Sequence, residues 1–547
     1  MCFFKEANIV YIGCFIVALS LAQDLIVDLP DGTIRGSEIT FQDKRYYAYR
    51  GIPFAAPPIG KLRFQSPVPP NPWDGILEAN ETQRCCISMS PDNQMSEDCL
   101  YLNVYTPARK ITEKLPVLFW IYGGGFTIGC TSDVLTGPFY LLDEDVIVVY
   151  ANYRLGLYGF LSTEDDVVLG NAGLKDQLLA MKWTKNNIAL FGGDPEKITI
   201  FGESAGGISV GAHIVNTKSA ELYRAAICQS GCSLTYIPNV STQTNARQAA
   251  YDYAKYVDPT ISEQNTTTEI RDFLQSLPAN VLTPAYSANS RTGISIEVEH
   301  EDAYVTNLSF PLLESGNFNQ VPVIIGTTSA ETLPLFAILG GELAARATAA
   351  TMDSDLASLI PADLVPLPGT NATDVGSQIR EAYVGPNGTF GEHLGAVIEA
   401  SITSDQLFVR STLKQAEIQS NFAPVYVYQF SFAGSLNSLP SIEGAGRAGH
   451  VEDTLYLFSF TPLVADRDIL ISKQIVKLWA NFAKTLNPTP DPADPLFNLT
   501  WPQVSPNNIQ YLDFDDEIAV KPNRKEKQMA MWNDVYYTYG QQPFPGF

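Results

Sequence analysis

The stretch FGESAGG, residues 201–207, places Ser204 between two glycines in the pattern G-x-S-x-G. Serine is a preferred N-cap residue and glycine is common in turns, so the pattern alone also fits an ordinary helix start. The residues KITIF before it (197–201) are typical of a strand, and AGGISVGAHIV after it (205–215) can begin a helix. A strand, a sharp turn and a helix in this order form a nucleophile elbow. We therefore predict that Ser204 is a nucleophile.

Strand and helix patterns alternate along the rest of the chain. Apolar, β-rich runs predict buried strands at 115–121, 145–151, 197–201, 321–325 and 425–432. Apolar residues at helical spacing predict helices within 173–191 and 469–488, the second ending before Pro488. This alternation predicts an α/β protein with a large, mostly parallel sheet and right-handed crossovers. We expect residues 23–547 to form one domain.

Composition narrows the possible functions. The 547 residues are 45% hydrophobic and 17% charged, with a formal net charge of −24. These proportions describe a globular chain and exclude a mainly disordered one. Because so acidic a chain repels phosphate backbones, we expect no nucleic-acid partner, and any long-range steering favours neutral or cationic ligands.

The N-terminus predicts export. Lys5 precedes an apolar run from Ile9 to Leu21, and Ser20-Leu21-Ala22 supplies small residues for cleavage. We interpret residues 1–22 as a signal peptide, because the run is shorter than the ~20 apolar residues that a membrane span needs. No later segment is long and apolar enough to span a membrane, so we expect a secreted, extracellular protein.

Cysteines and glycosylation motifs fit that route. Six cysteines follow the predicted signal and suggest disulfides, although six allow 15 pairings: Cys85, Cys86, Cys99, Cys130, Cys228 and Cys232. The pattern N-x-[ST] predicts a glycoprotein with candidate sites at Asn80, Asn239, Asn265, Asn307, Asn371, Asn387 and Asn498.

A serine nucleophile needs a base, and the chain has four histidines. His213 lies along the helix after the elbow and is expected to be structural, whereas His300 and His393 are expected at the surface. His450 follows the 425–432 strand, late in the chain. This position fits a chain order in which the serine comes first, the acid second and the histidine last. We predict that His450 is the base.

The acid and the oxyanion donors are expected at other strand ends. Glu331 follows the predicted strand 321–325 and its small-residue turn, although many other carboxylates lie between Ser204 and His450. Three glycines, Gly123 to Gly125, directly follow the strand 115–121, and their N–H groups can approach a substrate because no Cβ intervenes. Glu331 is therefore a candidate acid, and the glycines form a candidate oxyanion hole.

Several long motifs resemble the type-B carboxylesterase and cholinesterase family. They include SEDCLYLNVYTP (96–107), WIYGGGF (120–126), NYRLGLYGFL (152–161), FGGDPEKITIFGESAGG (191–207) and GHVEDTLYLF (449–458), and the likeness to secreted insect carboxylesterases is greatest. The resemblance implies an α/β-hydrolase fold and a catalytic triad of Ser204, Glu331 and His450. It also implies oxyanion donors at Gly124, Gly125 and Ala205, a disulfide between Cys86 and Cys99 beside an active-site gorge, and no metal or organic cofactor.

Departures from the family pattern bear on the substrate. The loop from Cys86 to Cys99 contains no tryptophan, the residue that family cholinesterases use there as a cation–π platform for choline. Glu203 stands where family juvenile hormone esterases typically have glutamine. A cholinesterase and a juvenile hormone esterase are therefore both disfavoured. The resemblance then implies hydrolysis of small uncharged carboxylic esters, such as odorant, pheromone or xenobiotic esters. The other alternative is an inactive adhesion protein on the same fold, but such members usually lack the serine.

Overall fold

The computed structural model describes residues 25–546 apart from 90–94, 132–135, 239, 241–244, 290–292, 401–403, 438, 460, 507 and 523. The predicted signal peptide, residues 1–22, and the candidate glycosylation site Asn239 lie outside the described residues. Among the described residues, no helix is long and apolar enough to cross a membrane.

The main element of the fold is a sheet that, within the described ranges, has 11 strands. In spatial order they are β16 (Ala519–Lys521), β15 (Tyr511–Phe514), β14 (Val425–Phe430), β13 (Val323–Thr328), β12 (Ala225–Gln229), β11 (Gly193–Glu203), β9 (Leu115–Ile121), β10 (Ile147–Ala151), β8 (Tyr101–Thr106), β4 (Lys44–Pro53) and β3 (Ser37–Phe41). Strands β15 to β10 pair in parallel, and antiparallel strands extend both edges. The predicted mostly parallel α/β architecture is therefore confirmed.

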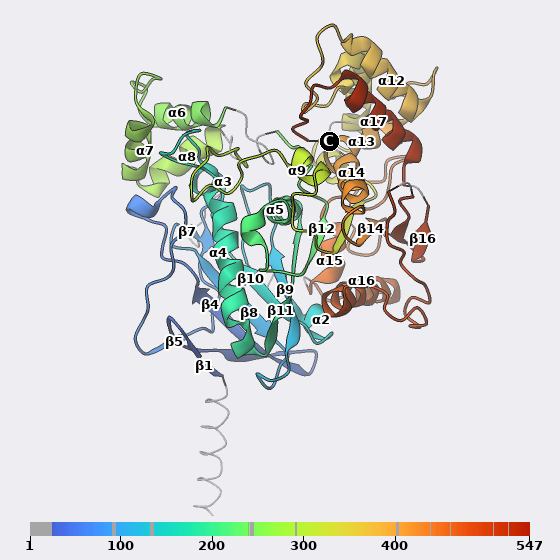
Figure 1. Cartoon of the computed structure of the whole chain (residues 1–547). Helices are drawn as coiled ribbons and strands as arrows, with labels where there is room; N and C mark the ends of the chain where they lie inside the picture. The colour runs from blue at the N-terminus through green and yellow to red at the C-terminus, as the bar shows by residue number, and fades with distance from the viewer. Residues whose placement is uncertain are drawn as a thin grey trace, which may run out of the picture.

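Helices cover the parallel strands, which explains why those strands are mainly apolar. Helix α16 (Asp466–Thr485) packs against α2 (Phe139–Leu142) and against β9 and β11. Helices α4 (Ala172–Asn187), α5 (Ala205–Ile214) and α14 (Arg410–Gln419) pack against β11, β12 and β13, among other strands. In Figure 1, α16 lies beside α2 at the lower right and α4 runs along the left of the central strands. Strands covered by helices on both faces need apolar side chains on both faces.

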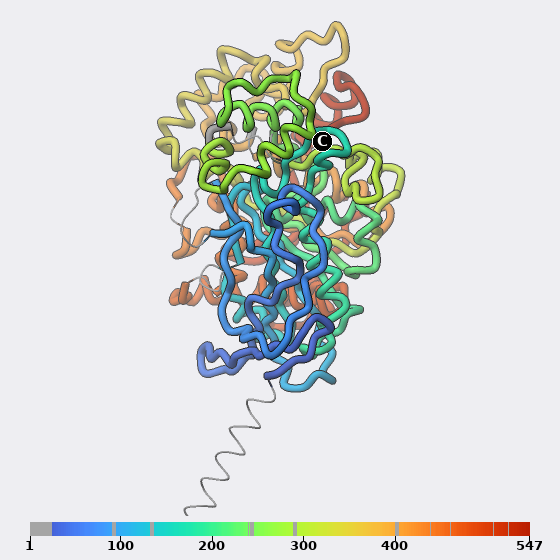
Figure 2. The backbone as a smooth tube through the Cα atoms, turned by 90° about the vertical axis from the view of Figure 1, so that its left-hand side faces the viewer, coloured from blue at the N-terminus to red at the C-terminus, as the bar shows by residue number. Residues whose placement is uncertain are grey.

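Two helical excursions lie at one end of the sheet. The first contains α6 (Ala246–Val257), α7 (Thr267–Ser276) and α8 (Ala279–Asn289). The second contains α10 (Leu333–Ile338), α11 (Glu342–Ser354), α12 (Ala372–Val384) and α13 (Leu394–Ala400). The C-terminal helix α17 (Glu526–Tyr539) packs against α12 of the second excursion. Figure 1 places α6 to α8 at the upper left and α12, α13 and α17 at the upper right. Figure 2 shows both excursions at the top, above the N-terminal strands in blue.

The remaining elements are short. Strands β1 (Ile26–Leu29), β2 (Gly32–Arg35) and β5 (Ile76–Glu78) form a small sheet, β6 (Cys85–Cys86) pairs with β7 (Met95–Ser96), and two short helices are α3 (Gly156–Phe160) and α9 (Ser309–Glu314). The predicted strands all occur, but β11 is longer than the run 197–201 that the sequence indicates. Its first residues include a register shift between Gly193 and Ile198, where charged residues break the apolar pattern.

Candidate active site

Ser204 lies on a sharp turn between the end of β11 and the start of α5. Its φ and ψ are 60° and −123°, a conformation that residues with a Cβ rarely adopt. The turn is held because the Ser204 N–H donates to the Gln229 carbonyl at 2.9 Å and the Ser204 carbonyl accepts from Ile208 N–H at 2.9 Å. The sequence prediction of a strand, a turn and a helix around Ser204 therefore matches the local backbone.

Glycines beside the turn allow this close packing. A Cβ on Gly206 would lie 2.0 Å from the Ile121 carbonyl oxygen, and one on Gly202 would lie 2.5 Å from the Gly206 backbone. The start of α5 therefore touches the end of β9 backbone to backbone. Only residues without a side chain fit there, which fixes where the serine hydroxyl is presented.

His450 and Glu331 come together from two loops that follow neighbouring strands, β14 and β13. His450 Nδ1 lies 2.6 Å from Glu331 Oε2, and the His450 backbone N–H donates to the Glu331 carbonyl at 3.2 Å. Glu331 Oε1 accepts from Ser230 Oγ and from Thr328 N–H, both at 2.7 Å. A fully bonded carboxylate behind one ring nitrogen fixes the orientation of the imidazole and leaves Nε2 to face the elbow.

Nε2 faces the elbow because it lies 3.2 Å from Glu203 Oε1, and Glu203 directly precedes Ser204. Glu203 Oε1 has no hydrogen-bond partner among the described residues, so the distance is short but the geometry is not that of a hydrogen bond.

Two carboxylates beside His450, those of Glu203 and Glu331, set the electrostatics of the site. Burial on its own lowers the pKa of His450, but the negative charges of Glu203 and Glu331 outweigh it and raise the pKa to about 9. Burial raises the pKa of Glu203 to about 8, although the charge of His450 opposes the shift. Burial also acts to raise the pKa of Glu331, but His450 and the donated hydrogen bonds lower it overall. Glu331 is thus the permanent anion, whereas Glu203 and His450 titrate as a coupled pair.

The glycine loop after β9 passes directly over the elbow. A Cβ on Gly123 would lie 2.5 Å from the Glu203 carbonyl oxygen and 2.9 Å from Ser204 Cβ. Gly124 and Gly125 then continue with φ of +102° and +61°. Ala205, the first residue of α5, has its N–H at the helix N-terminus, where negative charge is favoured. The structure therefore brings all three predicted oxyanion residues to the neighbourhood of Ser204.

Sequence reasoning missed several residues of this network. Ser230 bonds Glu331, and buried Asp453 accepts from Gln229 Nε2 at 2.9 Å and from the Tyr428 hydroxyl at 2.7 Å. In the sequence, Glu203 is informative only as a marker of substrate class. Proximity to His450 in the motif GHVED is the one signal that could have pointed to Asp453, whereas nothing in the sequence links Ser230 to Glu331.

The other histidines lie where the sequence predicts. His213 is buried, with Nε2 2.9 Å from Gln177 Oε1 and Nδ1 2.5 Å from the Tyr304 hydroxyl. His300 and His393 are exposed. Among the described residues, no group of three or more histidine, cysteine, aspartate or glutamate side chains has the arrangement of a metal site.

Two disulfides are present in the described chain. Cys86 pairs with Cys99, as the resemblance implies, and Cys85 pairs with Cys130, which the sequence left open. Cys228 and Cys232 are buried free thiols. Of the candidate glycosylation sites that are described, Asn265 is half-buried and the others are exposed.

Comparisons with known proteins bear on what this site does. The sequence profile of the carboxylesterase family matches residues 23–532. The chain is 31% identical to juvenile hormone esterase of Tribolium castaneum, with 92% of this chain and 90% of that protein covered, and 31% identical to acetylcholinesterase of Bungarus fasciatus, with 95% and 88% covered.

A solved structure has the same fold. The crystal structure of juvenile hormone esterase from Manduca sexta with OTFP covalently attached superposes with a TM-score of 0.80 at 28% identity, covering 94% of this chain and 99% of that one. The large sheet flanked by helices is thus an α/β-hydrolase fold. By profile, sequence identity and fold, the chain belongs to the carboxylesterase family of carboxylic ester hydrolases.

Proposed function

We propose that this protein is a secreted serine carboxylesterase that hydrolyses uncharged carboxylic esters through an acyl-enzyme. The observation that carries the proposal is the position of His450, whose Nδ1 is 2.6 Å from Glu331 Oε2 while Nε2 faces the residue before Ser204. A nucleophile, a base and an anion that orients the base are the parts that ester hydrolysis by a serine requires.

The first half of the reaction forms the acyl-enzyme. Ser204 Oγ attacks the ester carbonyl carbon while His450 Nε2 accepts the hydroxyl proton. Glu331, held by Ser230 and Thr328, stabilises the imidazolium that results. His450 then gives the proton to the departing alcohol oxygen as the carbon–oxygen bond breaks. In the second half, His450 activates water, which attacks the acyl carbon and releases the carboxylic acid and Ser204.

The developing oxyanion is stabilised by backbone N–H groups of Gly124, Gly125 and Ala205. Two of these belong to the loop that passes over Ser204, and the third lies at the N-terminus of α5. Loss of one such donor costs an ester-hydrolysing enzyme about 10²–10³ in kcat. This contribution is largest in the transition state, where the carbonyl oxygen carries negative charge.

The proposed substrate class follows from the absence of an aromatic residue that could bind a cationic substrate. No tryptophan occurs between Cys86 and Cys99. A cation–π contact is worth ~0.5–2 kcal/mol, which corresponds to at most about thirtyfold in specificity. We therefore propose little preference for choline esters, and odorant, pheromone or xenobiotic esters as natural substrates.

Juvenile hormone esterase is a second candidate function. Both a curated relative and a solved structure of similar fold carry that name. Glu203 argues against it, since juvenile hormone esterases typically have glutamine at that place in the motif.

One substrate comparison separates these possibilities. We expect kcat/KM for acetylcholine and for its uncharged carbon isostere, 3,3-dimethylbutyl acetate, to agree within about thirtyfold. The measurement needs about 1 M salt, where the Debye length of ~3 Å screens the attraction of a net charge of −24 for the cation. A hundredfold preference for acetylcholine would overturn the uncharged-ester proposal, and a hundredfold preference for juvenile hormone over both acetates would favour the second candidate.

Secretion is supported by the N-terminal pattern and by two disulfides, which form in oxidising compartments. In a eukaryotic expression host, the protein should appear in the medium with Gln23 as its first residue and with glycans that an amidase removes. Retention inside the cell with residues 1–22 still attached would contradict this.

A further inference from the structure

The loop that carries two of the proposed oxyanion donors, residues 123–130, has an unfavourable backbone. Gly124, Gly125 and Gly129 have φ of +102°, +61° and +129°, and Phe126 has φ of +59°. Glycine adopts such angles easily, but a residue with a Cβ does so only when its surroundings require it. The conformation of this loop must therefore be imposed by contacts at its two ends and beneath it.

The start of the loop and its middle are fixed by aromatic residues. The Tyr122 and Tyr153 rings stack with centroids 4.5 Å apart, and each hydroxyl donates to the other residue's carbonyl, at 3.1 and 2.9 Å. Phe126 is fully buried, and its carbonyl accepts from Gly156 N–H at 2.7 Å. These contacts hold residues 122–126 against the body of the fold.

The far end of the loop is tied to a different segment of the chain. Cys130 is bonded to Cys85, 45 residues earlier. Nearby, Met89 N–H donates to the Thr127 carbonyl at 3.0 Å, and Thr131 N–H donates to Asn152 Oδ1 at 3.0 Å. The disulfide is the covalent member of this set of contacts.

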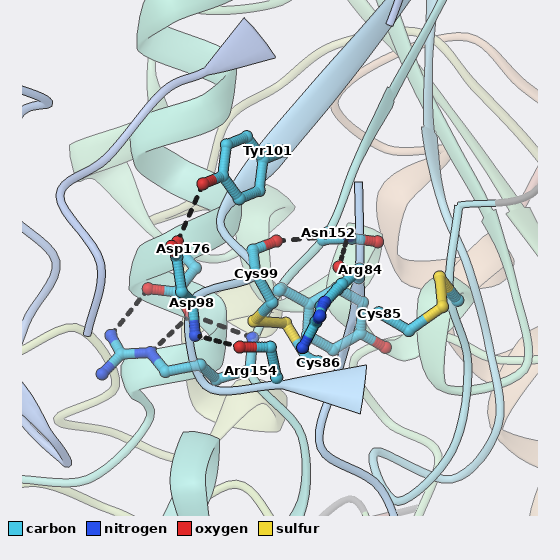
Figure 3. Close-up of a disulfide and its surroundings, with 12 residues drawn as sticks. Arg84, Cys85, Cys86, Asp98, Cys99, Tyr101, Asn152, Arg154 and Asp176 are labelled. Carbon is cyan, nitrogen blue, oxygen red and sulfur yellow. Dashed lines mark hydrogen bonds and ion pairs between the residues drawn. A yellow bond between two sulfur atoms is a disulfide. The ribbon is translucent and has the colours of Figure 1, made fainter. Parts of the chain in front are cut away.

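Cys85 is itself held in place, which is what allows it to act as an anchor. Its neighbour Cys86 is bonded to Cys99, and the Asn152 amide donates to the carbonyls of Arg84 at 3.3 Å and Cys99 at 3.1 Å. Figure 3 shows Cys85 and Cys86 side by side with Asn152 reaching both chain segments. Asn152 thus bonds both sides of the junction, because its oxygen accepts from Thr131 and its nitrogen donates toward Arg84 and Cys99.

We propose that the Cys85–Cys130 disulfide is a positioning element of the oxyanion hole, which keeps the loop 123–130 in the conformation that directs the Gly124 and Gly125 N–H groups at the substrate oxygen. The inference rests on the proposed function. It assigns a role in the reaction to two cysteines that are not members of the proposed triad. It also predicts that the disulfide matters more for the transition state than for substrate binding, since only the transition state carries the full oxyanion.

The test compares a double variant, Cys85→Ala with Cys130→Ala, with the wild type. Active sites are first counted by titration with an organophosphate, so that inactive protein is not included. Per active site, kcat for a neutral ester should fall about tenfold or more while KM changes less than about threefold. The affinity for a trifluoromethyl ketone, whose hemiketal oxygen is an oxyanion once Ser204 has added, should fall by the same factor as kcat.

A matched variant controls for a general loss of stability. Val375→Ala removes buried volume from α12 in the second excursion, away from the loop. It should lower the melting temperature but leave kcat and ketone affinity per active site within about twofold of wild type. If Val375→Ala loses kcat and ketone affinity to the same extent, instability alone explains the losses in the double variant.

Reduction of the wild type gives an independent measurement if the double variant does not fold. Cys85 and Cys130 are half-buried, whereas Cys86 and Cys99 are buried, so a water-soluble phosphine should open the first disulfide before the second. The loss of kcat should follow the alkylation of Cys85 and Cys130 measured by mass spectrometry. If the wild type is active, and if kcat and ketone affinity are unchanged both in the double variant and after reduction of the Cys85–Cys130 disulfide, the proposed role of the disulfide is overturned. A wild type that hydrolyses no ester would instead overturn the proposed function itself.

Discussion

At the scale of single residues, the site depends on how much negative charge surrounds His450. Glu331 supplies the charge that orients the ring, and Glu203, once it ionises above its pKa of about 8, adds a second charge 3.2 Å from Nε2. Together they raise the pKa of His450 against the opposing effect of burial. An imidazole with a raised pKa is protonated at neutral pH and cannot accept the serine proton. We therefore expect kcat/KM of the wild type to rise with pH through the alkaline side of neutrality, as His450 deprotonates.

Glu203→Gln should move that rise to lower pH. The substitution removes a negative charge beside Nε2, which lowers the pKa of His450 and makes the neutral base available earlier. Charges within about 4–6 Å shift a pKa by about 1–3 units, so the acid limb of the kcat/KM profile should move by about that amount. Glu443→Gln, which removes the same charge from an exposed position on the segment before His450, should leave the profile in place. An unchanged acid limb in Glu203→Gln would show that Glu203 does not control the base.

Residue types and chain order predict Ser204 as the nucleophile and His450 as the base, because a strand before the serine and a late histidine leave few alternatives. Glu331 needed the family resemblance, since many carboxylates lie between the other two. Ser230 and Asp453 could not be predicted, because their partners, Glu331 in the loop after β13 and Tyr428 on β14, are distant in the sequence. Contacts between distant segments leave no local pattern in the sequence.

At the scale of elements, the elbow depends on the contact between the start of α5 and the end of β9. The Gly206 backbone lies so close to Ile121 that a Cβ would be 2.0 Å from its carbonyl oxygen. An added methyl group there meets backbone, which cannot rotate away, so the start of the helix must shift.

Gly206→Ala should therefore lower both stability and activity. Overpacking of this kind costs about 1–3 kcal/mol of unfolding free energy, and displacement of the turn should reduce kcat/KM about a hundredfold. Gly391→Ala is a matched control, since its Cβ would meet its nearest neighbour at 3.5 Å, and it should remain close to wild type in thermal melting and in kcat/KM. Wild-type activity in Gly206→Ala would mean that the elbow tolerates a side chain and that this account of its geometry is wrong.

At the scale of the whole molecule, the sequence predicts the central strands well and the edges poorly. The predicted runs correspond to β9, β10, β11, β13 and β14, whose central residues are apolar and buried, whereas the central strand β12 is not among the predicted runs. The edge strand β3 alternates half-buried and exposed residues, and its neighbour β4 mixes exposed, half-buried and buried residues, so both carry a weaker signal. Large excursions from the domain are expected from the sequence, but the two helical excursions above the strands could be located only once the sheet was known.

The whole arrangement converges on one atom, the Ser204 hydroxyl oxygen, and the most direct test is its covalent labelling. Incubation with an organophosphate followed by peptide mass spectrometry should find one adduct per chain, on the peptide that contains Ser204. Esterase activity should fall in proportion to the adduct, and Ser204→Ala should take up no label and keep no more than residual activity. An adduct on another residue, or a Ser204→Ala variant within tenfold of wild-type activity, would contradict the account.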